Sequence, residues 1–399
     1  MRVLLFCLSW VVLGASAPAA DTPGLVQDQP ASGPFVKTDK GFMVPYTATI
    51  PGTEVTFEMI PIPGGEFLLG SPDSEPGRES DEGPQVLVQT RPFWMQKNEL
   101  RWAEYKEYMD LYNVFKKFEE GKIRLVTETN TLDAITAPTE LYDPSFTFEF
   151  GEDPELPAVS MTLYAARQYT KWLSAVTGQQ YRVPTEVEWE YAARGGAKTA
   201  YAFGDDPTQL AEYGWFAETS QEKGPRKVGL GKPNAYGLCD MHGNVAEWVQ
   251  DEYSVEGYAG LQTKSAAANK TALRVQDVLG KPTAHDSRVV RGGSWQDPAE
   301  GCRSAARLGS DYSEWKERDP NLPKSPWWMT DKPVCGIGFR LLRSIDELPR
   351  DQIERFWNID SESLQLDVDG RIPGRGVYGL VDKDLTEAVK TLKATEKKR

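Results

Sequence analysis

The stretch Arg291-Gly292-Gly293-Ser294-Trp295, followed by Cys302-Arg303-Ser304-Ala305-Ala306-Arg307, decides how this sequence is interpreted. A tryptophan beside hydrogen-bond donors is a common platform for a peptide or a sugar, and it is equally common in a protein core. The stretch contains a single cysteine, and the functional interpretation depends on that count. From these residues we predict a groove lined by Ser294, Trp295, Asp297 and Arg307.

The composition is that of a globular protein with an irregular, turn-rich fold. The 399 residues include 35 glycines, 28 prolines and 12 tryptophans, and 40% of the residues are hydrophobic. The formal net charge of -14 argues against nucleic acid or an anionic membrane surface as a partner, because both require clustered Lys and Arg. The basic run at residues 396–399 is typical of a solvated tail.

The first twenty residues have the pattern of a secretory signal peptide. Arg2 supplies a positive charge, residues 3–14 are largely apolar, and Ala15-Ser16-Ala17 offers a small-residue cleavage site. The apolar run is too short for an ordinary membrane span. We therefore expect export to a periplasmic or extracellular compartment and no transmembrane segment.

The rest of the chain divides into three parts that differ in amino-acid composition and in their motifs. Residues 21–50 are rich in Pro, Gly, Asp and Thr and are expected to form a leader or linker. Residues 51–345 contain the motifs and are expected to form one domain, with polar insertions at 115–157 and 255–287. Residues 346–399 are expected to form a C-terminal extension.

Local patterns predict several elements inside this domain. Alternating residues at 55–59 and Pro63-Gly64-Gly65 before residues 66–70 indicate a hairpin, and residues 86–88 and 93–95 are typical of strands. Helical spacing predicts helices at 99–111 and 163–176, the second ending at Gly178. Thr185, with Glu188 three residues later, predicts the capping box of a third helix.

Five sequence blocks occur in a fixed order. They are residues 63–70 (PGGEFLLG), 182–196 (RVPTEVEWEYAARGG), 236–248 (YGLCDMHGNVAEW), 291–295 (RGGSW) and 338–340 (GFR). Together they resemble the formylglycine-generating enzyme, or sulfatase-modifying factor, family. The resemblance implies an α+β domain related to the C-type lectin fold, with irregular loops and a few helices packed on short antiparallel sheets.

Fold does not settle function in this family, since its members include oxidases, sulfur-inserting iron enzymes and binding modules. The iron enzymes use three histidines, and this chain has only His242 and His285. That count argues against a non-haem iron site. His242 is better explained as a packing residue than as a catalytic base.

The turn at residues 243–247 has a donor set that suits Ca²⁺, a cation that prefers oxygen ligands. Relatives bind calcium in this block. Carried over by position, Asn244 and Glu247 would ligate through their side chains, and Gly243 and Val245 through backbone oxygens. The alternative is a metal-free capped turn.

The oxidases of the family bind Cu(I) through two cysteines after the RGGSW block and convert a substrate cysteine to formylglycine. Soft thiolates are the ligands that Cu(I) requires. In this chain Asp297 occupies the place of the first cysteine, and Cys302 does not obviously match the second. Asp297 cannot replace a thiolate, so we do not expect a copper site. The remaining catalytic candidates are Cys302 and Ser294.

An exported chain would retain Cys239, Cys302 and Cys335, an odd number. A disulfide between Cys302 and Cys335 is the preferred pairing, because both belong to the C-terminal half of the motif system. Three buried thiols are the alternative, and so is a displaced copper pair made by Cys302 and Cys335.

The leading interpretation is an exported binding or accessory module that uses the groove around Ser294 and Trp295, with calcium as a structural ion and a protein, peptide or glycan as ligand. An active copper oxidase with rearranged ligands is the second hypothesis. A structural envelope or matrix component, assembled through the two insertions, is the third.

Overall fold

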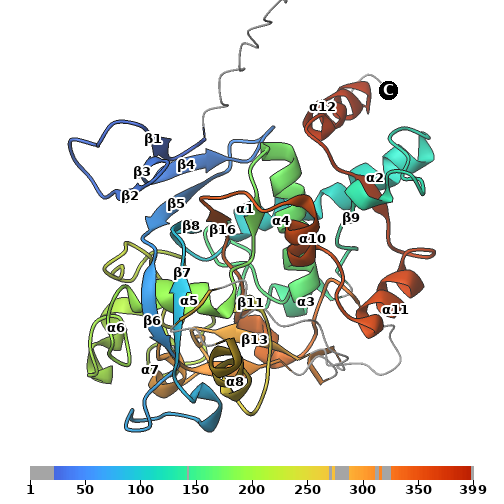
Figure 1. Ribbon diagram of the computed structural model, residues 1–399. Helices are drawn as coiled ribbons and strands as arrows, with labels where there is room; N and C mark the ends of the chain where they lie inside the picture. Colours follow the sequence, from blue (N-terminus) through green and yellow to red (C-terminus); the bar gives the residue numbers. More distant parts are fainter. Residues whose placement is uncertain are drawn as a thin grey trace, which may run out of the picture.

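The computed structural model describes residues 22–141, 143–268, 272–274, 287–310, 314–316 and 325–396. Helices and short sheets are mixed throughout (Figure 1), so the expected α+β class is confirmed. The signal peptide expected at residues 1–20 lies outside the described residues, as do His285 and part of the 255–287 insertion. Across the described ranges, no helix has the length and apolar character needed to cross a membrane.

The largest sheet has five strands and joins segments far apart in the sequence. Its order is β10 (Tyr181–Arg182), β16 (Leu342–Ser344), β8 (Phe93–Gln96), β5 (Thr56–Ile62) and β4 (Tyr46–Thr49), and all its neighbours are antiparallel. The leader therefore contributes an edge strand to the domain. Before that strand, β1 (Leu25–Val26), β3 (Gly41–Met43) and β2 (Val36–Thr38) form a small sheet of their own.

The four-stranded sheet holds the two ends of the decisive stretch, Arg291 and Arg307. Its order is β14 (Arg307–Gly309), β13 (Arg288–Arg291), β11 (Ala246–Glu252) and β15 (Ile337–Gly338). Arg291 pairs with Glu247 in the antiparallel β13–β11 ladder, while β11 and β15 are parallel. This register brings the RGGSW, GNVAE and GFR blocks to one place in the molecule.

The remaining sheets are small. A three-stranded sheet has the order β12 (Leu273–Arg274), β7 (Val86–Thr90) and β6 (Gly65–Leu69). A two-stranded sheet pairs β17 (Tyr378–Leu380) with β9 (Ala134–Thr136). The strands expected at 86–88 and 93–95 are confirmed, but the hairpin expected around residues 63–65 is wrong. β6 pairs with β7, whereas β5 pairs with β4 and β8, because the chain changes sheets at Pro63-Gly64.

The helices begin and end close to the expected residues. The helix expected at 99–111 is α1 (Trp102–Met109), which α2 (Leu111–Glu120) follows directly. The helix expected at 163–176 is α4 (Leu163–Thr177), and Gly178 ends it with a left-handed φ of 68°. The other helices are α3 (Pro144–Thr147), α5 (Glu186–Arg194), α6 (Leu210–Tyr213), α7 (Ala217–Ser220), α8 (Ala259–Ala268), α10 (Arg350–Trp357), α11 (Glu362–Arg371) and α12 (Leu385–Glu396).

Helix α5 connects two of the sheets. It begins at the expected capping box, in which the Thr185 hydroxyl accepts the Glu188 N–H and the Glu188 carboxylate accepts the Thr185 N–H. The helix contacts β6 and β7 on one side and β11 and β13 on the other. All nine of its residues are buried, so its polar side chains must find partners inside the protein.

The C-terminal segment packs along one side of the domain (Figure 1), where α10 lies against α4. The Trp357 indole N–H donates to the Tyr181 carbonyl over 3.0 Å. The β17–β9 pairing joins this segment to the 115–157 insertion. Both regions therefore contribute to the main core, which is rich in aromatic side chains around Tyr105 and Tyr169.

Candidate functional site

The decisive stretch begins with two glycines that take a sharp turn after β13. Gly292 and Gly293 have φ values of 98° and 65°. A Cβ on Gly292 would lie 3.0 Å from the Trp189 ring, and one on Gly293 would lie 2.7 Å from the Cys302 sulfur. Glycine is therefore required at both positions, and the turn carries Ser294 and Trp295 away from the sheet.

Arg291 anchors this turn inside the protein. Its guanidinium donates to the Ala305 carbonyl over 2.7 Å and forms an ion pair with Glu190, although its side chain is fully buried. Glu190 also accepts from Arg194 over 2.9 Å. The arginine thus holds the RGGSW block against α5 and against the segment after Cys302.

The three alternating glutamates of α5 are all paired with arginines. Glu186 accepts from Arg307 over 2.6 Å, Glu188 accepts from Arg182 over 2.6 Å, and Glu190 pairs with Arg194 and Arg291. Arg307 also stacks on Tyr258, with its guanidinium 4.6 Å from the ring centroid. Arg307 therefore does not reach the pocket described next, and the glutamates are structural.

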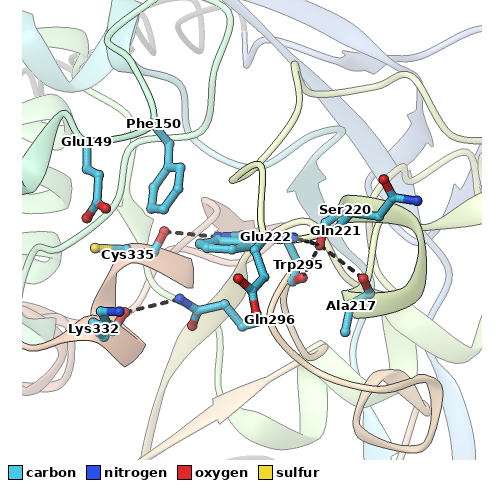
Figure 2. Close-up of a pocket in the computed structure, with 10 residues that line it drawn as sticks. All are labelled: Glu149, Phe150, Ala217, Ser220, Gln221, Glu222, Trp295, Gln296, Lys332 and Cys335. Carbon is cyan, nitrogen blue, oxygen red and sulfur yellow. Dashed lines mark hydrogen bonds between the residues drawn. The ribbon is translucent and has the colours of Figure 1, made fainter.

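A pocket of about 630 Å³ lies beside Trp295 (Figure 2). The Trp295 indole N–H donates to the Cys335 carbonyl over 3.2 Å, and the Phe150 ring meets the Trp295 ring edge-on with centroids 4.6 Å apart. The Ser220 hydroxyl donates to the Trp295 carbonyl over 2.7 Å. The lining residues are Glu149, Phe150, Ala217, Ser220, Gln221, Glu222, Trp295, Gln296, Lys332 and Cys335.

One rim of the pocket has an unusual backbone. Gln221 and Glu222 both have positive φ, 49° and 61°, although neither is glycine. Such residues cost about 1–2 kcal/mol each in the left-handed region. Gln221 takes this conformation as the C-cap residue of α7, a position where the left-handed region is common.

Ser294 and Asp297 lie behind the pocket wall and do not line the pocket. The Ser294 N–H and hydroxyl both donate to one Asp297 carboxylate oxygen, over 2.8 and 2.7 Å. This bonding closes the turn that carries Trp295. Of the four groove residues predicted from the sequence, only Trp295 is on the pocket surface.

The preferred disulfide is not present. Cys239, Cys302 and Cys335 are all buried and none is joined in a disulfide, so the alternative of three thiols is the one the structure has. Cys302 packs under the Gly293 turn with Ala200, Tyr201 and Phe216, whereas Cys335 belongs to the main core beside Trp295. The Gly293 turn therefore occupies the space on one side of the Cys302 sulfur. Burial raises the pKa of the Cys302 thiol well above its usual value.

The side chains expected to bind calcium already have partners in the protein. The Asn244 amide donates to Glu99 over 2.7 Å, and its oxygen accepts the Arg226 N–H over 2.9 Å. Glu247 Oε1 accepts from Arg340 over 2.6 Å. Glu247 Oε2 also accepts from Arg340, and it accepts from the Trp189 indole N–H over 2.8 Å. Gly243 and Val245 lie in the same turn, where the Val245 N–H donates to Glu99 over 2.8 Å.

Asp240, which the sequence reasoning did not single out, completes a buried acidic group with Glu99 and Glu247. Burial raises the pKa of Glu99 well above its usual value, and the neighbouring Asp240 and Glu247 charges add to the effect. One Asp240 oxygen accepts the Gly229 N–H over 2.5 Å. The other is buried without a hydrogen bond, 3.8 Å from Arg226 Nη2. Within the described ranges, however, no three His, Cys, Asp or Glu side chains converge as a metal site would require.

His242 lies between this turn and Cys302. One ring nitrogen is 2.9 Å from the Cys302 carbonyl, and Nε2 accepts the Ala202 N–H over 3.1 Å. Burial lowers the pKa of His242 to about 4. The ring is therefore neutral near pH 7 and serves as a packing and hydrogen-bonding residue.

The rim residues were missed because they come from segments without periodicity. Glu149 and Phe150 belong to the 115–157 insertion, and Gln221 and Glu222 belong to the turn-rich stretch before the calcium block. An aromatic residue such as Phe150 in a polar insertion was the one available signal.

Comparison with known proteins shows the family to which this sequence is similar. The Sulfatase-modifying factor enzyme 1-like domain matches residues 47–318. A formylglycine-generating enzyme of Thermomonospora curvata is 29% identical, with 61% of this chain and 84% of that protein aligned. An inactive C-alpha-formylglycine-generating enzyme 2 of Mus musculus is 28% identical, with 63% of this chain and 80% of that protein aligned.

Two further similarities are more limited. A serine/threonine-protein kinase pkn1 of Chlamydia pneumoniae is 28% identical over 63% of this chain, but the chain spans only 35% of that protein's length. The structure of PvdO from Pseudomonas aeruginosa shares the fold, with a TM-score of 0.52 and 24% identity over 82% of this chain and 100% of that chain. On the strength of the domain match, this chain belongs to the sulfatase-modifying factor enzyme 1-like family.

Proposed function

We propose that this chain is an exported family member that binds a peptide segment of another protein in the Trp295 pocket and does not oxidise it. The observation that carries the proposal is the thiol content of the pocket wall. Cys335 is the one cysteine among the lining residues, while Cys302 is enclosed beneath the Gly293 turn.

Copper chemistry does not fit these residues. Cu(I) needs two thiolates, whereas Cys302 packs beneath the Gly293 turn in a different cluster from Cys335. Asp297 is a hard oxygen donor, and one of its oxygens already accepts from Ser294. A relative that carries the name of an inactive formylglycine-generating enzyme 2 is consistent with oxidation being dispensable in this family.

The pocket surface favours a peptide as the ligand. Trp295 and Phe150 offer an aromatic floor, and Glu149, Gln221, Glu222, Gln296 and Lys332 supply polar groups around it. Binding sites usually combine an apolar base with a few polar groups that fix orientation. A volume of about 630 Å³ accommodates a few side chains of an extended segment.

A random peptide library displayed on phage tests the binding proposal. Peptides enriched on the wild-type protein should be lost on Phe150→Ala, because Phe150 packs on Trp295. They should be retained on Phe35→Ala, a control at a residue that is 37% exposed and directly precedes β2. Peptides that bind wild type and Phe150→Ala alike would contradict the pocket as the binding site.

The rival oxidase hypothesis gives a different result. If Cys302 and Cys335 form a displaced copper pair, the protein should convert the cysteine of a peptide with the Cys-x-Pro-x-Arg motif to an aldehyde in the presence of Cu(I), with O2 as the oxidant. Mass spectrometry detects the loss of sulfur. Conversion that disappears in Cys302→Ser would replace our proposal with the oxidase.

We propose separately that Ca²⁺ stabilises the turn at residues 243–247. The buried Asp240 oxygen without a hydrogen bond supports this, as do two further carboxylates nearby. The ligands would be those expected from the sequence, the side chains of Asn244 and Glu247 and the carbonyl groups of Gly243 and Val245, with the Asp240 carboxylate added. Binding would require Asn244 and Glu247 to give up part of their bonding to Glu99 and Arg340. Ca²⁺ binding should make the melting temperature fall on addition of EGTA in wild type and much less in Asp240→Ala. A melting temperature unmoved by EGTA, with no calcium in the purified protein, would remove this proposal.

Export is proposed from the N-terminal pattern. A secreted or periplasmic fraction should contain a protein whose N-terminus, read by mass spectrometry, follows Ala17 or Ala19. A cell-associated product that still begins at Met1 would contradict it.

A further inference from the structure

A small cavity lies where the C-terminal segment meets the domain, on residues that the Trp295 pocket does not use. Its volume is about 30 Å³, enough for a water-sized or slightly larger particle. Tyr164 and Arg167 of α4, Arg288 of β13, Ser310 after β14, and Asp360 and Ser361 before α11 are among its lining residues.

The fixed charges around this cavity do not cancel. Asp360 pairs with both arginines, over 2.7 Å with Arg167 and 3.0 Å with Arg288. Among the lining residues, two guanidinium groups face one carboxylate, a formal excess of one positive charge, and the Asp251 carboxyl outside the lining also acts on Arg167. Burial lowers the pKa of Arg167, and the like charge of Arg288 adds to that effect.

Arg288 has hydrogen-bond donors to spare. Its side chain is only 9% exposed, and its guanidinium makes one hydrogen bond within the described residues, to Asp360. A guanidinium carries five N–H donors. By contrast Arg167 also donates to Gln250 over 2.9 Å.

The start of α11 adds to the positive potential. Ser361 is the N-cap, and its hydroxyl accepts the Leu364 N–H over 3.2 Å. The first turn of a ten-residue helix favours a negative charge. The excess charge, the unused Arg288 donors and the helix start all indicate an anion.

We propose that the cavity between α4, β13 and α11 binds one small monovalent anion, such as chloride, and that the anion joins the C-terminal segment to the domain. The small volume favours a single small anion over phosphate, sulfate and larger organic anions. Arg288 and Arg167 supply the donors, and Asp360 competes with the anion for both.

The melting temperature of the full chain tests the proposal at constant ionic strength, with chloride exchanged for gluconate, which is too large for the cavity. A ligand that binds only the folded state raises the melting temperature. We expect chloride to raise it by about 2 °C or more over gluconate. Equal melting temperatures of the wild type in the two salts would overturn the proposal.

Two variants change the effect in opposite directions. Arg288→Gln should lose the difference between chloride and gluconate, and Asp360→Asn should enlarge it, because the competing carboxylate is gone. Arg355→Gln, an exposed arginine of α10, is the matched control and should keep the wild-type difference. A difference that survives Arg288→Gln would contradict the site.

Crystals soaked in bromide give an answer that does not depend on the variants. An anomalous peak between Arg288 and Ser361 is expected. A peak elsewhere only, or water alone in the cavity, would overturn the anion proposal. Neither result would affect the proposal that the Trp295 pocket binds a peptide.

Discussion

Trp295 reaches the pocket because Gly292, Gly293 and Asp297 together set the path of the chain. The glycines remove the Cβ atoms that would strike Trp189 and Cys302. Asp297 then accepts both Ser294 donors and closes the turn. The sequence predicted a groove at this tryptophan, but it could not assign Asp297 and Arg307 to the supporting structure. Their partners, Ser294 and Glu186, are identified only by three-dimensional contacts.

Gln221 provides a test of strain at the pocket rim. Its φ of 49° favours glycine, so Gln221→Gly should raise the free energy of unfolding by about 0.5–1 kcal/mol. Gln209→Gly is the matched control, because Gln209 has a φ of −83° and should lose a similar amount. Denaturant unfolding measures both changes. A loss of stability in Gln221→Gly would show that the side chain compensates for the strain.

His242 predicts how stability depends on acidity. Its folded pKa of about 4 lies below the ordinary value of 6.5, so the unfolded chain binds the proton more readily. The stabilising contribution is complete above about pH 6.5 and is lost as the pH falls toward 4, about 3 kcal/mol in all. His242→Asn should flatten this part of the stability-against-pH curve. An unchanged curve would assign the acid sensitivity to other groups.

At the scale of elements, α5 shows what local sequence determines. Thr185 and Glu188 predicted its start, and the capping box is present. Thr185→Ala should lower the free energy of unfolding by about 1–2 kcal/mol, because the N-terminal N–H groups lose their acceptor. Thr185→Ser should restore most of that loss, since its hydroxyl can accept the same N–H. Chemical denaturation of the three proteins compares them, and equal losses in both variants would contradict the capping role.

The sequence predicted where strands lie better than it predicted which strands pair with each other. Residues 56–62 and 65–69 are both strands, and the glycines between them favoured a hairpin. The two strands nevertheless enter different sheets, because β5 finds β8 and β6 finds β7. Pairing depends on tertiary packing that a short alternating pattern does not contain.

At the scale of the whole molecule, the family blocks form a scaffold, and the less regular segments supply most of the pocket rim. The blocks meet around α5 and β11, where buried arginines pair with buried glutamates. The 115–157 insertion supplies Glu149 and Phe150, and the C-terminal segment covers α4. The α+β class followed from the blocks, whereas the pocket rim did not, because its residues lie in segments without periodicity.

The binding of Cu(I) by the mature protein tests the central claim most directly. The protein is loaded with Cu(I) under reducing conditions, challenged with a competing chelator and analysed for metal per chain. Our account predicts no retained copper, because Cys302 is enclosed beneath the Gly293 turn and Asp297 is not a thiolate. One copper ion per chain, lost in Cys302→Ser, would contradict it.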